Sequence, residues 1–140
     1  MIKKISIIGS GNVATHLGLA LKQCGITIQE IISRNKTSGF NLAKKLNCVF
    51  NNNFKNLLKT DLIIICVQDD NIKQVIDNLP NIAMVHTSGS TNLNVFGNRE
   101  NTGVLYPIQT LNKEIQTEFN CIPICIEANN ETFKKKLIQL

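Results

Sequence analysis

Glycines and small polar residues near the N-terminus form a pattern that is typical of phosphate binding. The segment Gly9-Ser10-Gly11-Asn12-Val13-Ala14 follows a β-rich run and opens a stretch whose apolar residues have helical spacing. In this strand–turn–helix context the first glycine permits a tight turn, the second lets the backbone approach a pyrophosphate, and a small third residue lets the helix pack on the strand. Amides at the helix N-terminus then hold the diphosphate. The pattern predicts a dinucleotide site at Gly9, Ser10, Gly11, Asn12 and Val13.

The end of the second predicted strand distinguishes NADP from NAD. Enzymes that use NAD place a carboxylate about 20 residues beyond the glycines, where it binds the ribose 2′-hydroxyl. Here the strand ends in Ser33 and Arg34, whose hydroxyl and guanidinium groups suit a 2′-phosphate. Glu30 would be the acidic partner if the strand ended earlier. The pattern favours NADP and leaves NAD possible.

A second group of polar residues follows the predicted strand at 83–86. Histidine titrates in the range needed for proton transfer, so His86 is a candidate catalytic residue. Ser88, two residues further on, is the second candidate. The alternative for His86 is a hydrogen-bonded structural role. Ser88, Gly89 and Ser90 offer hydroxyls and backbone amides, and we expect them to bind a substrate carboxylate, with a strand-to-helix cap as the alternative.

Several other polar side chains are candidates for substrate binding, helix capping or packing rather than for catalysis. Tyr106 and Thr110 follow a later strand, and we expect them to face the same cleft as substrate-binding residues. Asp69 and Asp70 begin a predicted helix, where adjacent carboxylates act as a cap and interact favourably with the helix dipole. His16 lies on the first helix and is predicted to be a surface or packing residue. No His, Cys and Asp cluster has ligand spacing, so no metal is expected.

Strands and helices alternate along the chain that positions these residues. Strands are expected at 4–8, 26–33, 48–50, 61–67, 83–86, 104–106 and 122–126, and helices at 12–23, 38–46, 70–79 and 131–140. A short helical segment is expected at Leu57-Leu58. This alternation indicates right-handed βαβ crossovers, and the continuous apolar run at 61–67 is typical of a strand buried on both faces. The sequence therefore predicts a single α/β domain over residues 1–140, a Rossmann-type, doubly wound and mostly parallel sheet.

Composition narrows the classes of partner. The 140 residues are 43% hydrophobic, and 15 Lys and Arg against 10 Asp and Glu give a net charge of +5. Aromatic residues are not interleaved with the lysines, so the charge indicates a solvated surface rather than a nucleic-acid interface. The longest apolar run, Leu62 to Val67, is too short for a membrane span, and no signal peptide precedes the first strand. We expect a cytoplasmic protein with no nucleic-acid or membrane partner.

The cysteine pattern argues against cross-links. Cys24, Cys48, Cys66, Cys121 and Cys125 lack CxxC spacing, and several lie in strand-like segments where we expect small buried hydrophobic residues. Cys121 and Cys125 fall on one face of a predicted strand, about 13 Å apart, which is too far for a disulfide. Neither disulfides nor zinc are expected.

Three further motifs support a family resemblance. They are Val67-Gln68-Asp69-Asp70, His86-Thr87-Ser88-Gly89-Ser90 and Tyr106-Pro107-Ile108-Gln109-Thr110. With the glycine turn and Ser33-Arg34, they make nearly the whole chain resemble the N-terminal domain of an uncharacterised family of Rossmann-like NADP oxidoreductases. That family is related to pyrroline-5-carboxylate reductase and to the NADP-binding domain of prephenate dehydrogenase.

The resemblance implies roles for several residues. Gly9, Gly11, Asn12 and Val13 would surround the pyrophosphate and Ser33-Arg34 the adenosine phosphate, while Val67 and Gln68 would line the cofactor cleft. Members of the family continue into a helical C-terminal domain that in related enzymes forms a dimer and closes the substrate cleft. Because the chain ends in a predicted helix at Leu140, we expect that domain to be missing here, and with it the surface for a homodimer.

Two functions follow from these expectations. The first is the NADP-binding part of an oxidoreductase that transfers a hydride to or from a small, carboxylated C=O or C=N substrate. The second is a non-catalytic NADP-binding sensor or scaffold, because one fold serves many functions. The resemblance also leaves open a deazaflavin cofactor alongside NADP. A substrate that is oxidised or reduced by the whole protein would distinguish the enzyme from the sensor.

Overall fold

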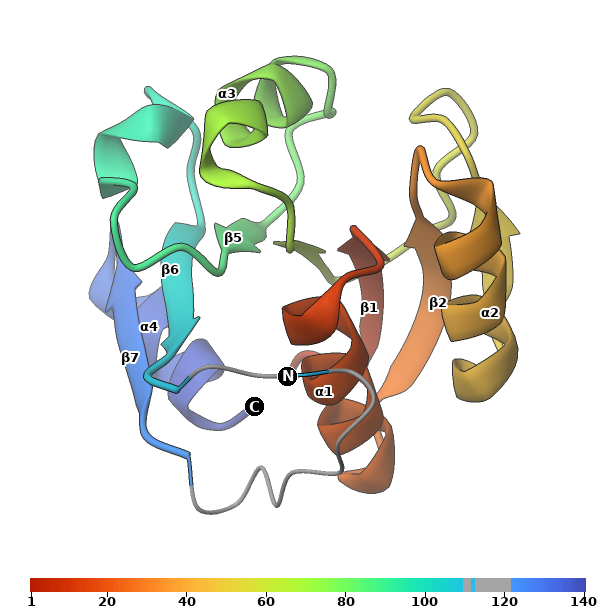
Figure 1. The fold of residues 1–140 in the computed structure, drawn as a ribbon. Helices are drawn as coiled ribbons and strands as arrows, with labels where there is room; N and C mark the ends of the chain where they lie inside the picture. Colours follow the sequence, from red (N-terminus) through yellow and green to blue (C-terminus); the bar gives the residue numbers. More distant parts are fainter. Residues whose placement is uncertain (110–111, 113–121) are drawn as a thin grey trace.

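A seven-stranded sheet runs through the molecule, with helices on both of its faces (Figure 1). The computed structural model describes residues 1–109, 112 and 122–140. The strands are β1 (Lys4–Ile8), β2 (Thr27–Ile32), β3 (Val49–Asn51), β4 (Leu62–Ile65), β5 (Met84–His86), β6 (Thr102–Pro107) and β7 (Ile124–Ala128). The helices are α1 (Asn12–Gln23), α2 (Lys36–Leu46), α3 (Asp69–Asp77) and α4 (Glu131–Ile138), with a 3-10 turn, η1, at Leu93–Phe96.

The strand order creates the place where a ligand binds. The order is β3-β2-β1-β4-β5-β6-β7, with β1 to β6 parallel and β7 antiparallel to β6. The chain leaves β1 toward β2 on one side and later returns to pair β4 on the other side. Such a reversal opens a crevice at the carboxyl ends of the two central strands. The predicted doubly wound, mostly parallel Rossmann sheet is confirmed.

The core consists of two apolar layers, one on each face of the sheet. All four residues of β4 are fully buried. Leu62 and Ile64 pack with residues of α1, α2 and α4, whereas Ile63 and Ile65 pack with residues of α3 and η1. Successive side chains of a strand point to opposite faces, so an uninterrupted apolar strand needs helices on both sides.

Several expected element boundaries were wrong, each for a local reason. Leu57-Leu58 forms no helix; the Leu58 amide instead donates a hydrogen bond to the buried Glu30 carboxylate at 2.9 Å. Helix α2 begins at Lys36, because the Asn35 side chain accepts a hydrogen bond from the Ser38 amide at 3.1 Å and caps the helix. The antiparallel direction of β7 and the turn η1 were not predicted.

Helix α3 also differs from its predicted start. Its N-cap is Gln68, with no side-chain cap hydrogen bond, so the cap predicted from the adjacent carboxylates is wrong. Asp69 and Asp70 both lie in the first turn, where the favourable dipole interaction applies. The Asp69 carboxylate is therefore left for other partners.

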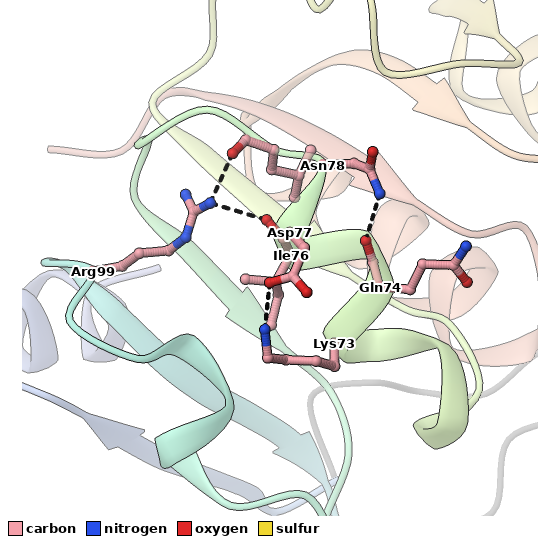
Figure 2. A network of polar contacts seen from close by, with 7 residues as sticks. Lys73, Gln74, Ile76, Asp77, Asn78 and Arg99 are labelled. Carbon is pink, nitrogen blue, oxygen red and sulfur yellow. Dashed lines mark hydrogen bonds and ion pairs between the residues drawn. The ribbon is translucent and has the colours of Figure 1, made fainter.

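Arg99 fastens the C-terminal end of α3 to the loop before β6. Its guanidinium donates hydrogen bonds to the carbonyls of Ile76 (3.0 Å), Leu79 (2.8 Å) and Pro80 (2.8 Å). Figure 2 shows the guanidinium pointing at the end of the helix, while the Lys73–Asp77 ion pair lies on the exposed side. The intrahelical hydrogen bonds stop at this end of α3, and Arg99 adds a charged donor to one carbonyl of the last helical turn and to two carbonyls just beyond it.

The cysteines are only partly as expected. Burial raises the pKa of the Cys66 thiol to about 12 and that of Cys48 to about 11, so both stay protonated. Cys24 and Cys125 are exposed, which corrects the expectation of a buried residue in the last strand. The reason is that β7 is the edge strand of the sheet. Cys121 lies outside the described residues.

No helix in the described part of the chain is long and apolar enough to cross a membrane.

Candidate cofactor and substrate site

The glycine turn connects β1 to α1 and touches the end of β4. Gly9 has a φ of +113°, and a Cβ at this position would lie 2.1 Å from the carbonyl oxygen of Cys66. Its amide donates a hydrogen bond to the carbonyl oxygen of Ile32 at 2.8 Å. Only glycine fits such a positive φ and so close an approach. The turn is therefore fixed between the ends of three neighbouring strands.

The same turn presents an open surface at the start of α1. Gly11 is the N-cap of this helix and supplies no side-chain hydrogen bond. A Cβ on Gly11 would have no atom within 4 Å, so its α-carbon faces empty space. First-turn amides and the positive end of the helix dipole attract anions. This arrangement fits the diphosphate of a dinucleotide.

A cavity of about 460 Å³ lies at the point where the strand order reverses. Seven of the predicted cofactor-binding residues line it: Gly9, Ser10, Gly11, Ser33, Arg34, Val67 and Gln68. The other two, Asn12 and Val13, are the first residues of α1 and follow this lining directly. Asn52, Phe54 and Asn71 also line the cavity, and the sequence analysis missed them. Asn52 and Phe54 lie between the strand expected at 48–50 and the helical segment expected at Leu57-Leu58, where no motif marked them.

Three serine hydroxyls connect the glycine turn to the end of β2. The Ser10 Oγ lies 2.8 Å from the Ser33 Oγ and 2.7 Å from the Ser38 Oγ. The exposed Arg34 follows Ser33, and Ser38 lies in the first turn of α2, beyond its cap Asn35. Hydroxyls, a guanidinium and a helix N-terminus together suit a phosphate dianion. Ser38 was not predicted, because its spacing in the sequence links it to neither motif.

Glu30 takes no part in the cavity. It lies inside β2 with no exposed surface, and β2 continues to Ile32. Its carboxylate oxygens accept hydrogen bonds from the Ser6 hydroxyl at 3.1 Å and the Leu58 amide at 2.9 Å. The alternative in which Glu30 binds the ribose therefore fails, because its oxygens are buried and paired within the sheet.

The carboxyl ends of β4 and β5 bring Asp69 and the serines together. The Ser90 hydroxyl donates a hydrogen bond to the Asp69 carboxylate at 2.5 Å. The Ser88 Oγ accepts hydrogen bonds from the amides of Ser90 and Thr91, both at 3.2 Å. Hydrogen bonds from the Ser90 and Ser88 hydroxyls hold the pKa of the Asp69 carboxyl below its usual range. The site thus contains a fixed negative charge at neutral pH.

His86 lies beneath this loop. Its side chain is fully buried, and its ring stacks on Phe96 with centroids 5.5 Å apart and an interplanar angle of 16°. The Ser88 amide donates a hydrogen bond to Nδ1 at 3.1 Å, which assigns the proton to Nε2. Burial lowers the pKa of His86, so the ring is neutral at pH 7. The contact at Nδ1 and the stacking on Phe96 fit the structural alternative, whereas the buried Nε2 has no hydrogen-bond partner among the described residues, and the catalytic role stays a prediction.

Tyr106 lies over the same loop from the end of β6. Its side chain is 36% exposed, and a Cβ on Gly89 would lie 2.5 Å from the Tyr106 Cε1. The ring therefore rests directly on the backbone of Gly89, which only a glycine permits. The structure brings together Tyr106, Ser88, Gly89 and Ser90 as predicted neighbours, and adds Asp69. Thr110 lies outside the described residues.

Two further expectations concern metals and His16. Among residues 1–109, 112 and 122–140, no three His, Cys, Asp or Glu side chains are grouped to hold a metal ion. His16 is buried in α1 and its Nε2 is hydrogen-bonded to the carbonyl oxygen of Asn112, as a packing residue would be.

Comparison with known proteins places this geometry in a family. Residues 4–87 match the family described as NADP oxidoreductase, coenzyme F420-dependent. BF3122 of Bacteroides fragilis, whose structure is assigned to an NADP oxidoreductase, is 30% identical with a TM-score of 0.86. The match covers 99% of this chain and 57% of BF3122, so the chain spans little more than half of that relative. No curated protein sequence matches.

More distant structures share the fold. Prephenate dehydrogenase from A. aeolicus, solved with hydroxyphenyl propionate and NAD+, is 11% identical over 99% of this chain and 56% of its own, with a TM-score of 0.77. Pyrroline-5-carboxylate reductase from Coxiella burnetii is 15% identical over 99% of this chain and 54% of its own, with a TM-score of 0.73. Together with the glycine turn and the cavity, the matches show that the chain belongs to the NADP-dependent oxidoreductase family and has its NADP-binding Rossmann fold.

Proposed function

We propose that this chain is the part of an oxidoreductase that binds NADP and guides a hydride between nicotinamide and a small C=O or C=N substrate. The observation that carries the proposal is that the cofactor cavity and the polar residues at the ends of β5 and β6 lie at the same edge of the sheet. The cavity lined by the glycine turn and Arg34 adjoins β4; beside it, Ser88 follows the end of β5 and Tyr106 lies near the end of β6. When bound, NADP supplies or accepts the hydride, and the protein supplies binding and orientation.

The preference for NADP rests on the Ser33 end of the cavity. The Ser10 hydroxyl lies within hydrogen-bond distance of the hydroxyls of Ser33 and Ser38, and Arg34 adds an exposed positive charge. A 2′-phosphate bound there would replace hydroxyl–hydroxyl contacts with charge-assisted ones, which are roughly twice as strong. Glu30 is buried, and none of the described residues that line the cavity is a carboxylate that would repel the dianion.

The contacts of the Ser88–Ser90 loop argue against a substrate carboxylate at this position. The sequence led us to expect a substrate carboxylate there. The Ser90 hydroxyl instead donates to the ionised Asp69, and Tyr106 covers Gly89. A second carboxylate beside Asp69 would be repelled. We therefore propose the reducible C=O or C=N group, rather than a carboxylate, for this position.

The test is a calorimetric titration of the chain with NADPH and with NADH at fixed salt. We compare the wild type with Arg34→Ser and with Lys135→Ser, which removes the same charge from the exposed face of α4. A charge-assisted pair contributes about 1.5–3 kcal/mol, so Arg34→Ser should weaken NADPH binding about 10- to 100-fold. NADH binding and the Lys135→Ser variant should change little. An equal loss for NADPH and NADH in Arg34→Ser would show that Arg34 does not recognise the 2′-phosphate.

Properties of a whole protein of the relatives' length are further proposals. We propose a cytoplasmic enzyme with a small-molecule substrate, and a homodimer formed through a helical domain beyond this chain. The non-catalytic sensor is the competing function. Tight NADPH binding without oxidation of NADPH by any C=O or C=N compound, in a protein of the relatives' full length, would favour it.

A further inference from the structure

Reduction of a C=O or C=N bond requires a proton as well as a hydride. The hydride goes to carbon, and the oxygen or nitrogen must take up a proton from a nearby acid. We infer that Tyr106 is this proton donor and that Gly89 is a glycine because the Tyr106 ring rests on its backbone. The inference rests on the proposed function and adds a role for Tyr106 beyond substrate contact.

The other candidate acids at this edge of the described structure are unsuitable. His86 is fully buried under the loop and neutral. Asp69 is ionised, since hydroxyl hydrogen bonds lower its pKa. The Ser90 hydroxyl already donates to Asp69. Cys66 is held protonated by burial, with a pKa of about 12. Tyr106, by contrast, carries a phenol and has 36% of its surface exposed.

The position of Tyr106 suits the nicotinamide end of the cofactor. In a sheet of this order a dinucleotide straddles the reversal point, with its two halves on opposite sides. Arg34 after β2 marks the adenosine side, so the nicotinamide side is that of β4 and β5. Tyr106 comes from β6, the next strand outward, and its ring leans back over the loop that follows β5.

The proton balance can be written for either direction. In reduction, the Tyr106 Oη would give its proton to the substrate heteroatom and regain one from water, while NADPH, when bound, would supply the hydride to carbon. In oxidation, the phenolate takes the proton back. The titratable groups on the elements around Tyr106 are Asp69 at the start of α3, His86 at the end of β5, and two residues of β7, Glu127 and the cross-strand partner Cys125.

The composition of the chain allows a direct measurement. It contains one tyrosine and no tryptophan, so the ultraviolet absorbance of tyrosinate reports on Tyr106 alone. We would titrate the 140-residue chain with saturating NADP+, with NADPH and with adenosine 2′,5′-bisphosphate, which lacks the nicotinamide. Only oxidised nicotinamide carries a positive ring, and a nearby cation favours the phenolate. We expect tyrosinate absorbance to appear at lower pH with NADP+ than with the bisphosphate, and no such displacement with NADPH, whose reduced ring is neutral.

The outcomes separate this inference from the proposed function. Saturating NADP+ that leaves the tyrosinate curve identical to that with the bisphosphate would overturn the role of Tyr106 and leave the cofactor proposal intact. Failure of NADP+ to bind in calorimetry would overturn the proposed function, and the inference with it.

Two variants sharpen the test. Tyr106→Phe keeps the ring on Gly89, so we expect unchanged circular dichroism and NADPH affinity within about twofold. A larger loss of affinity would mean that the phenol binds the cofactor, which would contradict its role as a proton donor.

Gly89→Ala puts a Cβ 2.5 Å from the Tyr106 ring and should displace the ring. We expect this variant to bind NADP+ but to lose the shift, and retention of the full shift would argue against the observed ring position.

Discussion

Gly9 and Gly11 show how two glycines of one turn serve different purposes. Gly9 has a φ of +113°, and any Cβ would lie 2.1 Å from the carbonyl oxygen of Cys66. Gly9→Ala should therefore destabilise the fold itself, by about 3 kcal/mol or more, since it combines backbone strain with overlap against backbone. Chemical denaturation would measure the loss. A variant as stable as the wild type would show that the turn can relax away from β4.

Gly11 is the matched case, because a Cβ there would meet no atom within 4 Å. Gly11→Val should fold with nearly wild-type stability, yet its side chain would stand where the pyrophosphate approaches the backbone. We expect at least a tenfold loss of affinity for both NADPH and NADH, on the order of 1.4 kcal/mol. Calorimetry with both dinucleotides checks this, and retained affinity would remove the assignment of the phosphate turn.

At the level of elements, one arginine secures α3. Arg99→Lys replaces a planar fork that reaches three carbonyls with a point charge that cannot satisfy all of them. We expect a loss of about 1–3 kcal/mol in the free energy of unfolding, measured by urea denaturation. Lys73→Ala, which removes the exposed ion pair to Asp77 on the same helix, should cost less than about 1 kcal/mol. Equal effects would mean that the Arg99 contacts add nothing beyond a surface charge.

The junction of β1 and β4 gives a prediction about pH. The Asp61 carboxylate accepts hydrogen bonds from the amides of Lys3 and Lys4, both at 2.9 Å, and these bonds lower its pKa. A carboxyl whose pKa is lower in the folded state stabilises the protein above its unfolded pKa of about 3.9, and this contribution is lost as the pH falls through the folded value. The wild type should lose more stability than Asp61→Asn between about pH 5 and pH 3. Parallel losses in urea titrations would contradict the role of these bonds.

For the whole molecule, cofactor binding should appear as stability. A ligand at a hundred times its Kd adds about 2.7 kcal/mol to the free energy of unfolding if it binds only the folded chain. For a chain of 140 residues this raises the Tm by roughly 10 °C. Thermal unfolding with NADPH and NADH at equal concentration should give the larger rise with NADPH. Equal rises would argue that the Ser33–Arg34 end does not distinguish the two.

The fold could be predicted because its signals are local in the sequence. The uninterrupted apolar run of β4 requires cover on both faces, and alternation of strands with helices selects a parallel, doubly wound sheet. The glycine turn belongs to this class of signal, since its positive φ and its position before α1 follow from adjacent residues. Ser33-Arg34 was found for the same reason, at the end of one strand.

Contacts between distant residues were decided only by the tertiary structure. The Ser6 hydroxyl and the Leu58 amide pair with Glu30, which removed it from the cleft. Phe96 buried His86, although its strand-end position was that of a catalytic residue. Asp69 and Ser90 meet because β4 and β5 are neighbours, and no spacing in the sequence indicates that pair.

The sequence by itself thus determined the class of fold, the glycine turn after the first strand and the NADP cofactor, because each depends on neighbouring residues and their backbone conformations. The tertiary structure decided which polar groups remain available for chemistry. Hydrogen bonds to Ser6 and Leu58 hold Glu30 within the sheet, and packing against Phe96 buries His86, whereas Tyr106 stays exposed. Strand order and side-chain packing set these pairings, and local periodicity carries no information about them.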